Sequence, residues 1–241
     1  MKEGRLLNEK DSIAINNKFK ISTQVNIVGF ILVTMAGWVD TVGVKLFLNE
    51  SPAFMTGRGL TLGYWAFKLD LKAFMSIVLV IIAFIIGSCI STIITRNIGL
   101  SGGLIFTGIL IIIASFPICL KEITIDTIII PMAMGCQNAA TSLTQINRTT
   151  HLTGPATDIG INIAKGNWRI VRFWILRWIG FPLGSIVGFN LVHMVNNNII
   201  NISTTLIIPA IIIILTAIIQ KIIFNIPLLD EINNIPEKEI N

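Results

Sequence analysis

Charged residues are scarce in this chain. They make up 13% of its 241 residues, whereas about 25% is usual in a soluble domain. Hydrophobic residues make up 53%, and the mean hydropathy is +0.79. Because the missing charge leaves long apolar runs, the composition excludes an ordinary soluble domain and predicts a multi-pass protein embedded in a lipid bilayer.

Other absences narrow the classes of function. The three cysteines, Cys89, Cys119 and Cys136, lie in apolar stretches without metal-ligand spacing, so we expect neither a disulfide framework nor a metal site. His151 and His193 have no second ligand three or four residues away. The chain has no nucleophile elbow, paired-aspartate protease signature or nucleic-acid-binding module. We therefore expect no catalytic residues, no cofactor and no nucleic-acid partner.

The two ends of the chain are polar. The first twenty residues are mixed in charge and lack the apolar core of a secretory signal, so the first span is expected to serve as the insertion signal. We expect residues 1–24 to form a cytoplasmic N-terminal segment and residues 226–241 to form a polar C-terminal tail.

Several apolar stretches are long enough to cross a hydrocarbon core of roughly 30 Å, which takes about 20 helical residues. The expected spans are residues 25–48, 72–95, 100–120, 123–146, 173–195 and 203–224. Residues 53–67 and 154–165 are apolar but shorter, and each contains a charge, Arg58 or Asp158. We expect these two pieces to be half-helices that dip into the protein interior, which gives an all-α membrane protein of about six transmembrane helices plus two half-helices.

A polar pattern occurs twice in these apolar surroundings. Each copy has a glycine three residues before an acid or amide, then a Thr-Gly pair, and another glycine six residues after that pair. The copies are Gly37–Asp40 with Met55–Gly63, and Gly135–Asn138 with Leu152–Gly160. Because polar groups are costly inside a bilayer, their repetition predicts two membrane repeats, residues 25–121 and 122–225.

Three spans and one half-helix per repeat would turn the second repeat upside down relative to the first, as in many secondary transporters. If the half-helices cross the membrane instead, each repeat has four spans and the repeats are parallel. Both arrangements place the termini and Lys165, Arg169 and Arg172 on the cytoplasmic side. We prefer six spans because a charge in the middle of a span costs about 2.5–3.5 kcal/mol.

The start of the sixth span is rich in basic and aromatic residues. Lys165, Arg169 and Arg172 alternate there with Trp168, Trp174 and Trp178. This pattern predicts an interfacial aromatic belt with basic anchors. The glycines that follow, Gly180, Gly184 and Gly188, are spaced as a helix-packing seam.

Asp40 is an acid well inside an apolar span. Its natural partners are Arg58 on the adjoining half-helix and Lys45 on the same helix. Two interpretations stay open: a structural ion pair, or a group that handles a proton or cation. Asn138, beside Gln137, takes the equivalent place in the second copy, where a buried amide also suits an interhelical hydrogen bond.

The Thr-Gly pairs, Thr56–Gly57 and Thr153–Gly154, are typical of helix starts. A threonine can accept a hydrogen bond from a free backbone N–H at the N-cap, and Pro155 in the first turn needs no donor. Two such helix N-termini meeting halfway across the membrane would favour an anion or a carboxylate-bearing solute.

The segments AGWVDTVGV, FMTGRGLTLG, AMGCQNAATS and HLTGPATDIG resemble those of the bacterial YoaK family of multi-pass membrane proteins (DUF1275). The resemblance covers about residues 22–225. The family tends to have Asn after the first Thr-Gly pair, where this chain has Arg58. The resemblance implies a bacterial cytoplasmic-membrane protein, and it implies no particular activity.

The sequence thus predicts a small-solute permease with a polar site between two repeats and with Asp40 as the titratable coupling group. The predicted site residues are Asp40, Thr56, Gly57, Arg58, Gln137, Asn138, Thr153, Gly154 and Asp158. The expected partners are the bilayer and a small polar or anionic solute. Two alternatives are a non-catalytic assembly or lipid-organising protein, and a membrane-embedded enzyme that uses Asp40, Asp158 and His151 as acid and base groups.

Overall fold

The computed structural model describes residues 23–48, 50–116, 119–120, 123–124 and 126–229, so most of the two expected polar ends lies outside the described residues. The described helices are α2 (Thr23–Val42), α3 (Met55–Lys68), α4 (Leu71–Ile98), α5 (Leu100–Ala114), α6 (Asp126–Ser142), α7 (Thr153–Ala164), α8 (Trp168–Asn196) and α9 (Thr204–Ile219). Two π-helical turns, η1 (Gly43–Leu48) and η2 (Gln220–Phe224), extend α2 and α9. Strands β1 (Cys119–Leu120) and β2 (Ile123–Thr124) pair antiparallel between α5 and α6.

Each expected span contains a helix, and the protein is an all-α, multi-pass membrane protein. Four of the described helices are long and apolar enough to cross a bilayer: α4, α8, and α2 and α9 with their π-helical extensions. Helices α5 and α6, with 15 and 17 residues, are shorter than expected. Helix α5 ends at Ala114, three residues before Pro117, and a proline one to three residues beyond a helix end is common. Helix α6 begins only after the β1–β2 pair.

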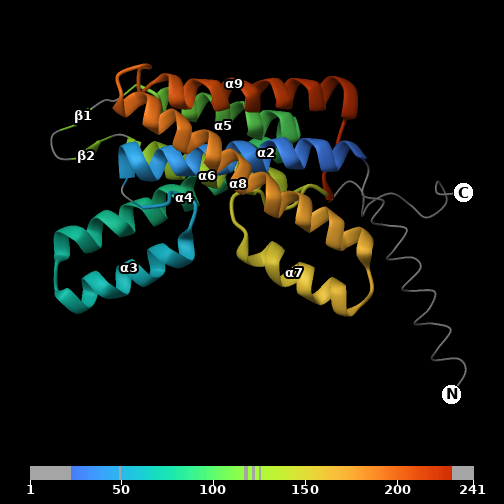
Figure 1. The fold of residues 1–241 in the computed structure, drawn as a ribbon, viewed down its shortest axis with the longest axis horizontal. Helices are drawn as coiled ribbons and strands as arrows, with labels where there is room; N and C mark the ends of the chain where they lie inside the picture. The colour runs from blue at the N-terminus through green and yellow to red at the C-terminus, as the bar shows by residue number, and fades with distance from the viewer. Residues whose placement is uncertain (1–22, 49, 117–118, 121–122, 125, 230–241) are drawn as a thin grey trace, which may run out of the picture.

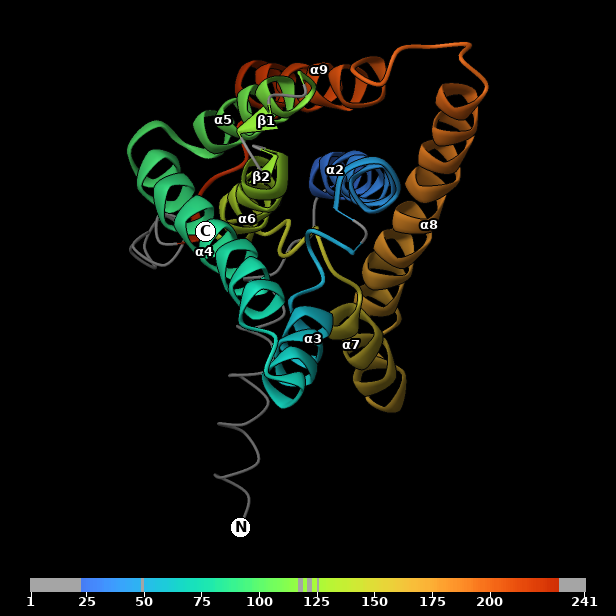
Figure 2. The ribbon, with the colours of Figure 1, turned by 90° about the vertical axis from the view of Figure 1, so that its left-hand side faces the viewer.

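The helices pack around a central pair. In Figure 2, α2 and α6 lie in the middle, α4 and α8 flank them, α5 and α9 cover one side, and α3 and α7 lie on the opposite side. The burial agrees with this arrangement, since 67% of the most apolar stretch of α2 is buried in the protein, compared with 28% of the corresponding stretches of α4 and α8. Helix α2 therefore belongs to the core, while α4 and α8 turn much of their apolar surface outward.

Glycines bring α2 and α8 into backbone contact. A Cβ atom on Gly37 would overlap the carbonyl oxygen of Phe181, and a Cβ on Gly184 would overlap that of Thr34. Ser185 adds a hydrogen bond from its hydroxyl to the Gly37 carbonyl at 3.3 Å. This packing confirms the predicted role of the glycine seam on α8, because small residues let the backbones of membrane helices approach closely.

Helices α6 and α4 make the same kind of contact. A Cβ on Gly135 would overlap the carbonyl oxygen of Phe84, and a Cβ on Gly87 would overlap that of Met132. Here Ser88 donates to the Gly135 carbonyl at 3.1 Å. The two glycines of the duplicated sequence pattern, Gly37 and Gly135, thus occupy matching crossings.

These crossings predict which glycines tolerate a methyl group. We expect Gly37→Ala and Gly135→Ala each to destabilise the protein by about 1–3 kcal/mol, the usual cost of overpacking a closed contact. Gly63→Ala on α3 is the matched control, because a Cβ at Gly63 meets nothing within 4 Å. Unfolding midpoints in detergent would check this, and an equal loss of stability in all three variants would contradict it.

Candidate functional site

Asp40 holds the segment that follows α2 through hydrogen bonds. It lies in the last turn of that helix, and its Oδ1 accepts hydrogen bonds from the Ser51 hydroxyl at 2.6 Å and from the Ala53 N–H at 3.2 Å. The Ser51 hydroxyl oxygen in turn accepts from the Phe54 N–H at 3.0 Å. The carboxylate therefore holds the segment between η1 and α3 against the end of α2.

Arg58, in the first turn of α3, is buried with 3% of its surface exposed. Its guanidinium forms an ion pair with the Glu50 carboxylate at 2.7 Å. It also donates to the carbonyl oxygens of Glu50 at 3.0 Å and of Ser51 at 3.2 Å. The polar cluster at the start of α3 thus consists of Asp40, Glu50, Ser51 and Arg58.

This geometry corrects the partners expected from the sequence. Arg58 forms its direct ion pair with Glu50, and its charge interacts with Asp40 without a direct contact. The ammonium group of Lys45 lies 5.8 Å from the centre of the Phe189 ring, on a different helix. The sequence reasoning missed Glu50 and Ser51, although an acid followed by Ser-Pro directly after an apolar helix is a visible signal of a polar turn.

A second polar cluster lies at Gln137 on α6, which is fully buried. Its side-chain amide donates to the Leu32 carbonyl on α2 at 2.9 Å and to the Thr149 hydroxyl at 3.1 Å. Within the described residues, the Gln137 Oε1 and the Asn138 Oδ1 are buried without a hydrogen-bond partner. Buried acceptors without a hydrogen-bond partner are uncommon in folded proteins.

The two clusters lie at different levels of α2. Gln137 contacts Leu32, which precedes Asp40 by eight residues, so the clusters are separated by about 12 Å along the helix axis at 1.5 Å per residue. The first is ionisable and the second is made of amides and hydroxyls. The structure brings Asp40 close to Arg58, and it brings Gln137 to a different part of the core.

The Thr-Gly pairs lie at helix starts, as predicted, since α3 begins at Met55 and α7 at Thr153. The predicted capping is wrong, because the N-cap residues are Phe54 and Leu152 and neither helix has a side-chain cap. Both helices begin towards the centre of the molecule and run outward in opposite directions (Figure 1). In the view turned by 90° they lie on the same side (Figure 2).

Asp158 lies on α7, half-buried, and in the described part of the chain its carboxylate has no hydrogen bond or ion pair. Its backbone carbonyl accepts from the Asn162 amide at 2.8 Å. His151 lies in the connection between α6 and α7, where burial lowers its pKa and the positive charge of Arg148 lowers it further.

The most deeply buried charge was not predicted. Arg177 on α8 has no exposed surface, and no acid pairs with it among the residues that the structure describes. Its guanidinium donates to the Ile146 carbonyl at 3.2 and 3.3 Å and to the Val25 carbonyl at 3.4 Å, and it lies 3.5 Å from the centre of the Phe173 ring. The signal in the sequence is an arginine inside an apolar run. Arg177 joins α8, α2 and the connection after α6.

Two cavities in the part of the chain that the structure describes lie away from the predicted site. One of about 430 Å³ lies between α2 and α8, and a smaller one of about 160 Å³ lies between the start of α5 and the end of α9. None of the nine predicted site residues lines either cavity. A single site shared by all nine residues therefore stays a prediction.

Long apolar helices, a glycine-packed core and buried polar clusters define a multi-pass helical membrane protein. The chain belongs to the DUF1275 family, described as "Protein of unknown function", whose profile matches residues 28–219. The match confirms the resemblance inferred from the sequence motifs. No curated protein and no solved structure matches the chain.

Arg177 and Gly29 provide a test of the buried arginine. A Cβ on Gly29 would overlap the Arg177 guanidinium, so we expect Gly29→Ala to destabilise the protein by about 1–3 kcal/mol. Arg177→Met should destabilise it by a similar amount, about 1–3 kcal/mol, because the Ile146 carbonyl loses its donors. In the Arg177→Met background the Gly29→Ala change should cost little. A double-mutant cycle on unfolding midpoints measures this coupling, and additive losses would contradict it.

Proposed function

We propose that this protein is a membrane transporter for a small polar or anionic solute, built from two inverted repeats, residues 25–121 and 122–225. The observation that carries the proposal is the arrangement of α3 and α7, which begin near the centre and run outward in opposite directions (Figure 1). Inverted repeats with interrupted helices that point their N-termini at the middle of the bilayer are typical of secondary transporters.

The matching contacts support the two repeats. Gly37 and Gly135 stand at equivalent crossings 98 residues apart, and their partner glycines, Gly184 and Gly87, are separated by 97 residues. The hydroxyls of Ser185 and Ser88 donate to the carbonyls of Gly37 and Gly135 in the same way. A nearly constant offset is what a duplicated unit would give, with the first helix of each unit packed on the third helix of the other.

The lengths of α3 and α7 support half-helices. With 14 and 12 residues, they would extend about 21 and 18 Å, which is less than a hydrocarbon core of roughly 30 Å. Each follows the first helix of its unit, and a polar side chain of that helix holds the connecting segment, through Asp40 and Ser51 in one unit and through Gln137 and Thr149 in the other. These hydrogen bonds would keep the connections turned back into the protein.

The chemistry of the proposed site is asymmetric. At the end of the first helix of each unit, the first unit has the ionisable Asp40, with Glu50 and Arg58 beside it, where the second has the amides of Gln137 and Asn138. Arg58 and the N-termini of α3 and α7 would attract an anionic group of the solute. Asp40 would couple transport to a proton or cation, with Thr56, Gly57, Thr153, Gly154 and Asp158 completing the predicted site.

The protein would act in the bacterial cytoplasmic membrane, with both termini in the cytoplasm. A non-catalytic assembly role is the second candidate, and the observation that favours it is the outer face of α3. Leu60, Tyr64 and Phe67 on that face are 79%, 51% and 80% exposed. Such a face suits contact with lipid or with another protein.

Accessibility of the two helix starts tests the proposed architecture. In a variant with Cys89, Cys119 and Cys136 replaced by alanine, we expect cysteines at Thr56 and Thr153 to react with a membrane-impermeant maleimide. A cysteine at Ile186, which is 56% exposed near the middle of α8, is the control that should stay unlabelled in lipid. Helix starts as unreactive as Ile186 from both sides would remove the water-filled site and favour the assembly role.

Uptake into proteoliposomes tests the transport activity. With a panel of labelled small carboxylates, we expect Asp40→Asn to abolish coupling to a pH gradient, because asparagine keeps the acceptor for Ser51 and cannot titrate. Arg58→Gln should reduce uptake at least about tenfold, since a buried charge contact with an anion contributes roughly 1.5–3 kcal/mol. Lys165→Gln, which removes an exposed charge outside the site, is the matched control. Uptake unchanged in the first two variants would refute the mechanism.

A further inference from the structure

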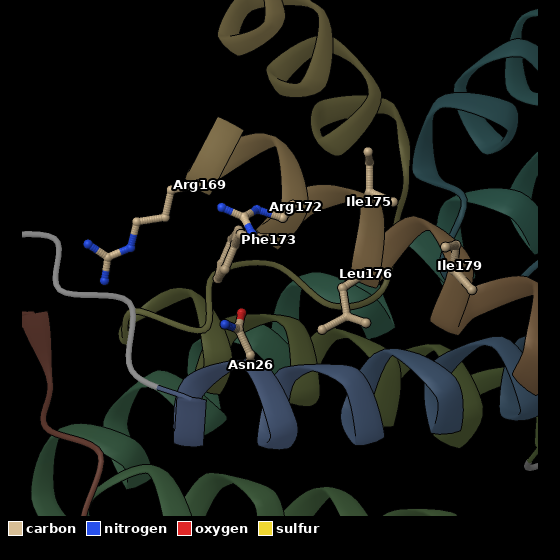
Figure 3. A pocket seen from close by; sticks show the side chains of 7 residues that line it. All are labelled: Asn26, Arg169, Arg172, Phe173, Ile175, Leu176 and Ile179. Carbon is tan, nitrogen blue, oxygen red and sulfur yellow. The ribbon is translucent and has the colours of Figure 1, made fainter. Parts of the chain in front are cut away.

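The cavity of about 430 Å³ lies where the first turn of α2 faces the first turns of α8 (Figure 3). Its volume is within the range of roughly 300–1,000 Å³ that is usual for sites of small ligands. The residues that line it are Asn26, Arg169, Arg172, Phe173, Ile175, Leu176 and Ile179. All but Asn26 come from α8.

Two guanidinium groups stand at one end of this cavity. Arg169 and Arg172 are three residues apart, so they lie one helical turn from each other on the same side of α8. Both side chains are exposed, and the guanidinium of Arg172 lies above Phe173 in the view of Figure 3. Arginine is the residue best suited to phosphate, because its planar group offers several donors in a fixed geometry.

Asn26 supplies a hydrogen-bond acceptor on the facing helix. Its side-chain oxygen is buried and has no hydrogen-bond partner among the described residues. In Figure 3 the amide points from α2 towards the part of α8 that carries Arg172. A ligand that fits here therefore combines a negative charge with a hydrogen-bond donor.

The other wall of the cavity is apolar. Ile175, Leu176 and Ile179 continue the face of Arg172 along α8, and Ile179 lies about 10 Å beyond Arg172 at 1.5 Å per residue. Ile175 and Ile179 are 39% and 50% exposed, so this wall is open to the bilayer. The charged end belongs to the start of α8, next to Trp168, which is 59% exposed and suits the membrane interface.

We propose that this cavity binds the headgroup of an anionic phospholipid that carries free hydroxyls, namely phosphatidylglycerol, on the cytoplasmic side of the membrane. Arg172 holds the phosphodiester, the side-chain oxygen of Asn26 accepts from a headgroup hydroxyl, and the acyl chain begins along Ile175 and Ile179. A free phosphate compound would use the same arginine but would leave the apolar wall bare. The site is independent of the proposed transport function.

Native mass spectrometry of the full-length protein in detergent tests the assignment by titration with phosphatidylglycerol. We expect Arg172→Gln to weaken binding of the first lipid about five-fold, the effect of one basic residue at a lipid headgroup. Lys165→Gln is the matched control, because Lys165 is exposed near the same end of the protein and does not line the cavity. An equal loss in the two variants would overturn the site and leave only a general attraction to anionic lipid.

The headgroup is tested separately. Asn26→Leu should remove any preference for phosphatidylglycerol over phosphatidylmethanol, which has the same charge and no hydroxyl, while overall binding persists. Glycerol 1-phosphate in millimolar excess should leave the lipid bound, and displacement by it would identify a soluble phosphate as the ligand and overturn the lipid assignment. An unfolding midpoint of Arg172→Gln equal to that of the unsubstituted protein shows that lost binding is not lost folding.

Discussion

Close approach of helix backbones at four glycines is the constraint on which the rest of the structure depends. In a bilayer the apolar side chains gain little by moving from lipid to protein, so tight van der Waals contact and interhelical hydrogen bonds must hold the helices together. Gly37 and Gly184 provide this contact between α2 and α8, and Gly135 and Gly87 provide it between α6 and α4. The two crossings fix the central pair α2 and α6, and with it the places where polar groups are buried.

The polar groups follow from that framework. With α2 and α6 enclosed, a side chain that leaves them towards the interior needs a partner, and the segments before α3 and α7 supply it. Ser51 donates a hydrogen bond to Asp40, and Thr149 accepts one from Gln137. Arg58 finds its counter-charge in Glu50, within the same connection. The proposed function rests on these connections, since they determine where α3 and α7 begin.

Hydropathy alone predicted where the helices lie, because each long apolar run contains a helix and the two short runs correspond to α3 and α7. The helix ends were less predictable: the π-helical turn after Val42 packs against α6, which is distant in the chain, and a short local strand pair takes the place of the first residues of the expected span before Asp126. The partners of the charges were harder still. Asp40 and Arg58 were visible as polar residues in apolar surroundings, but the choice of Glu50 over Asp40 reflects the path of the connection. Arg177 was not singled out, because it follows closely after Lys165, Arg169 and Arg172, which the sequence pattern assigned to the membrane surface.

The exchange of partners between the two halves has a consequence for biogenesis. Helix α2 ends at Val42, and the helix it packs on, α8, begins only at Trp168. During synthesis α2 therefore enters the membrane long before the surface that will cover its glycine face exists. Neither half can close its own core, so assembly must wait until nearly the whole chain has left the ribosome. A first half released alone would keep a bare glycine seam facing lipid and would be a natural substrate for membrane quality control.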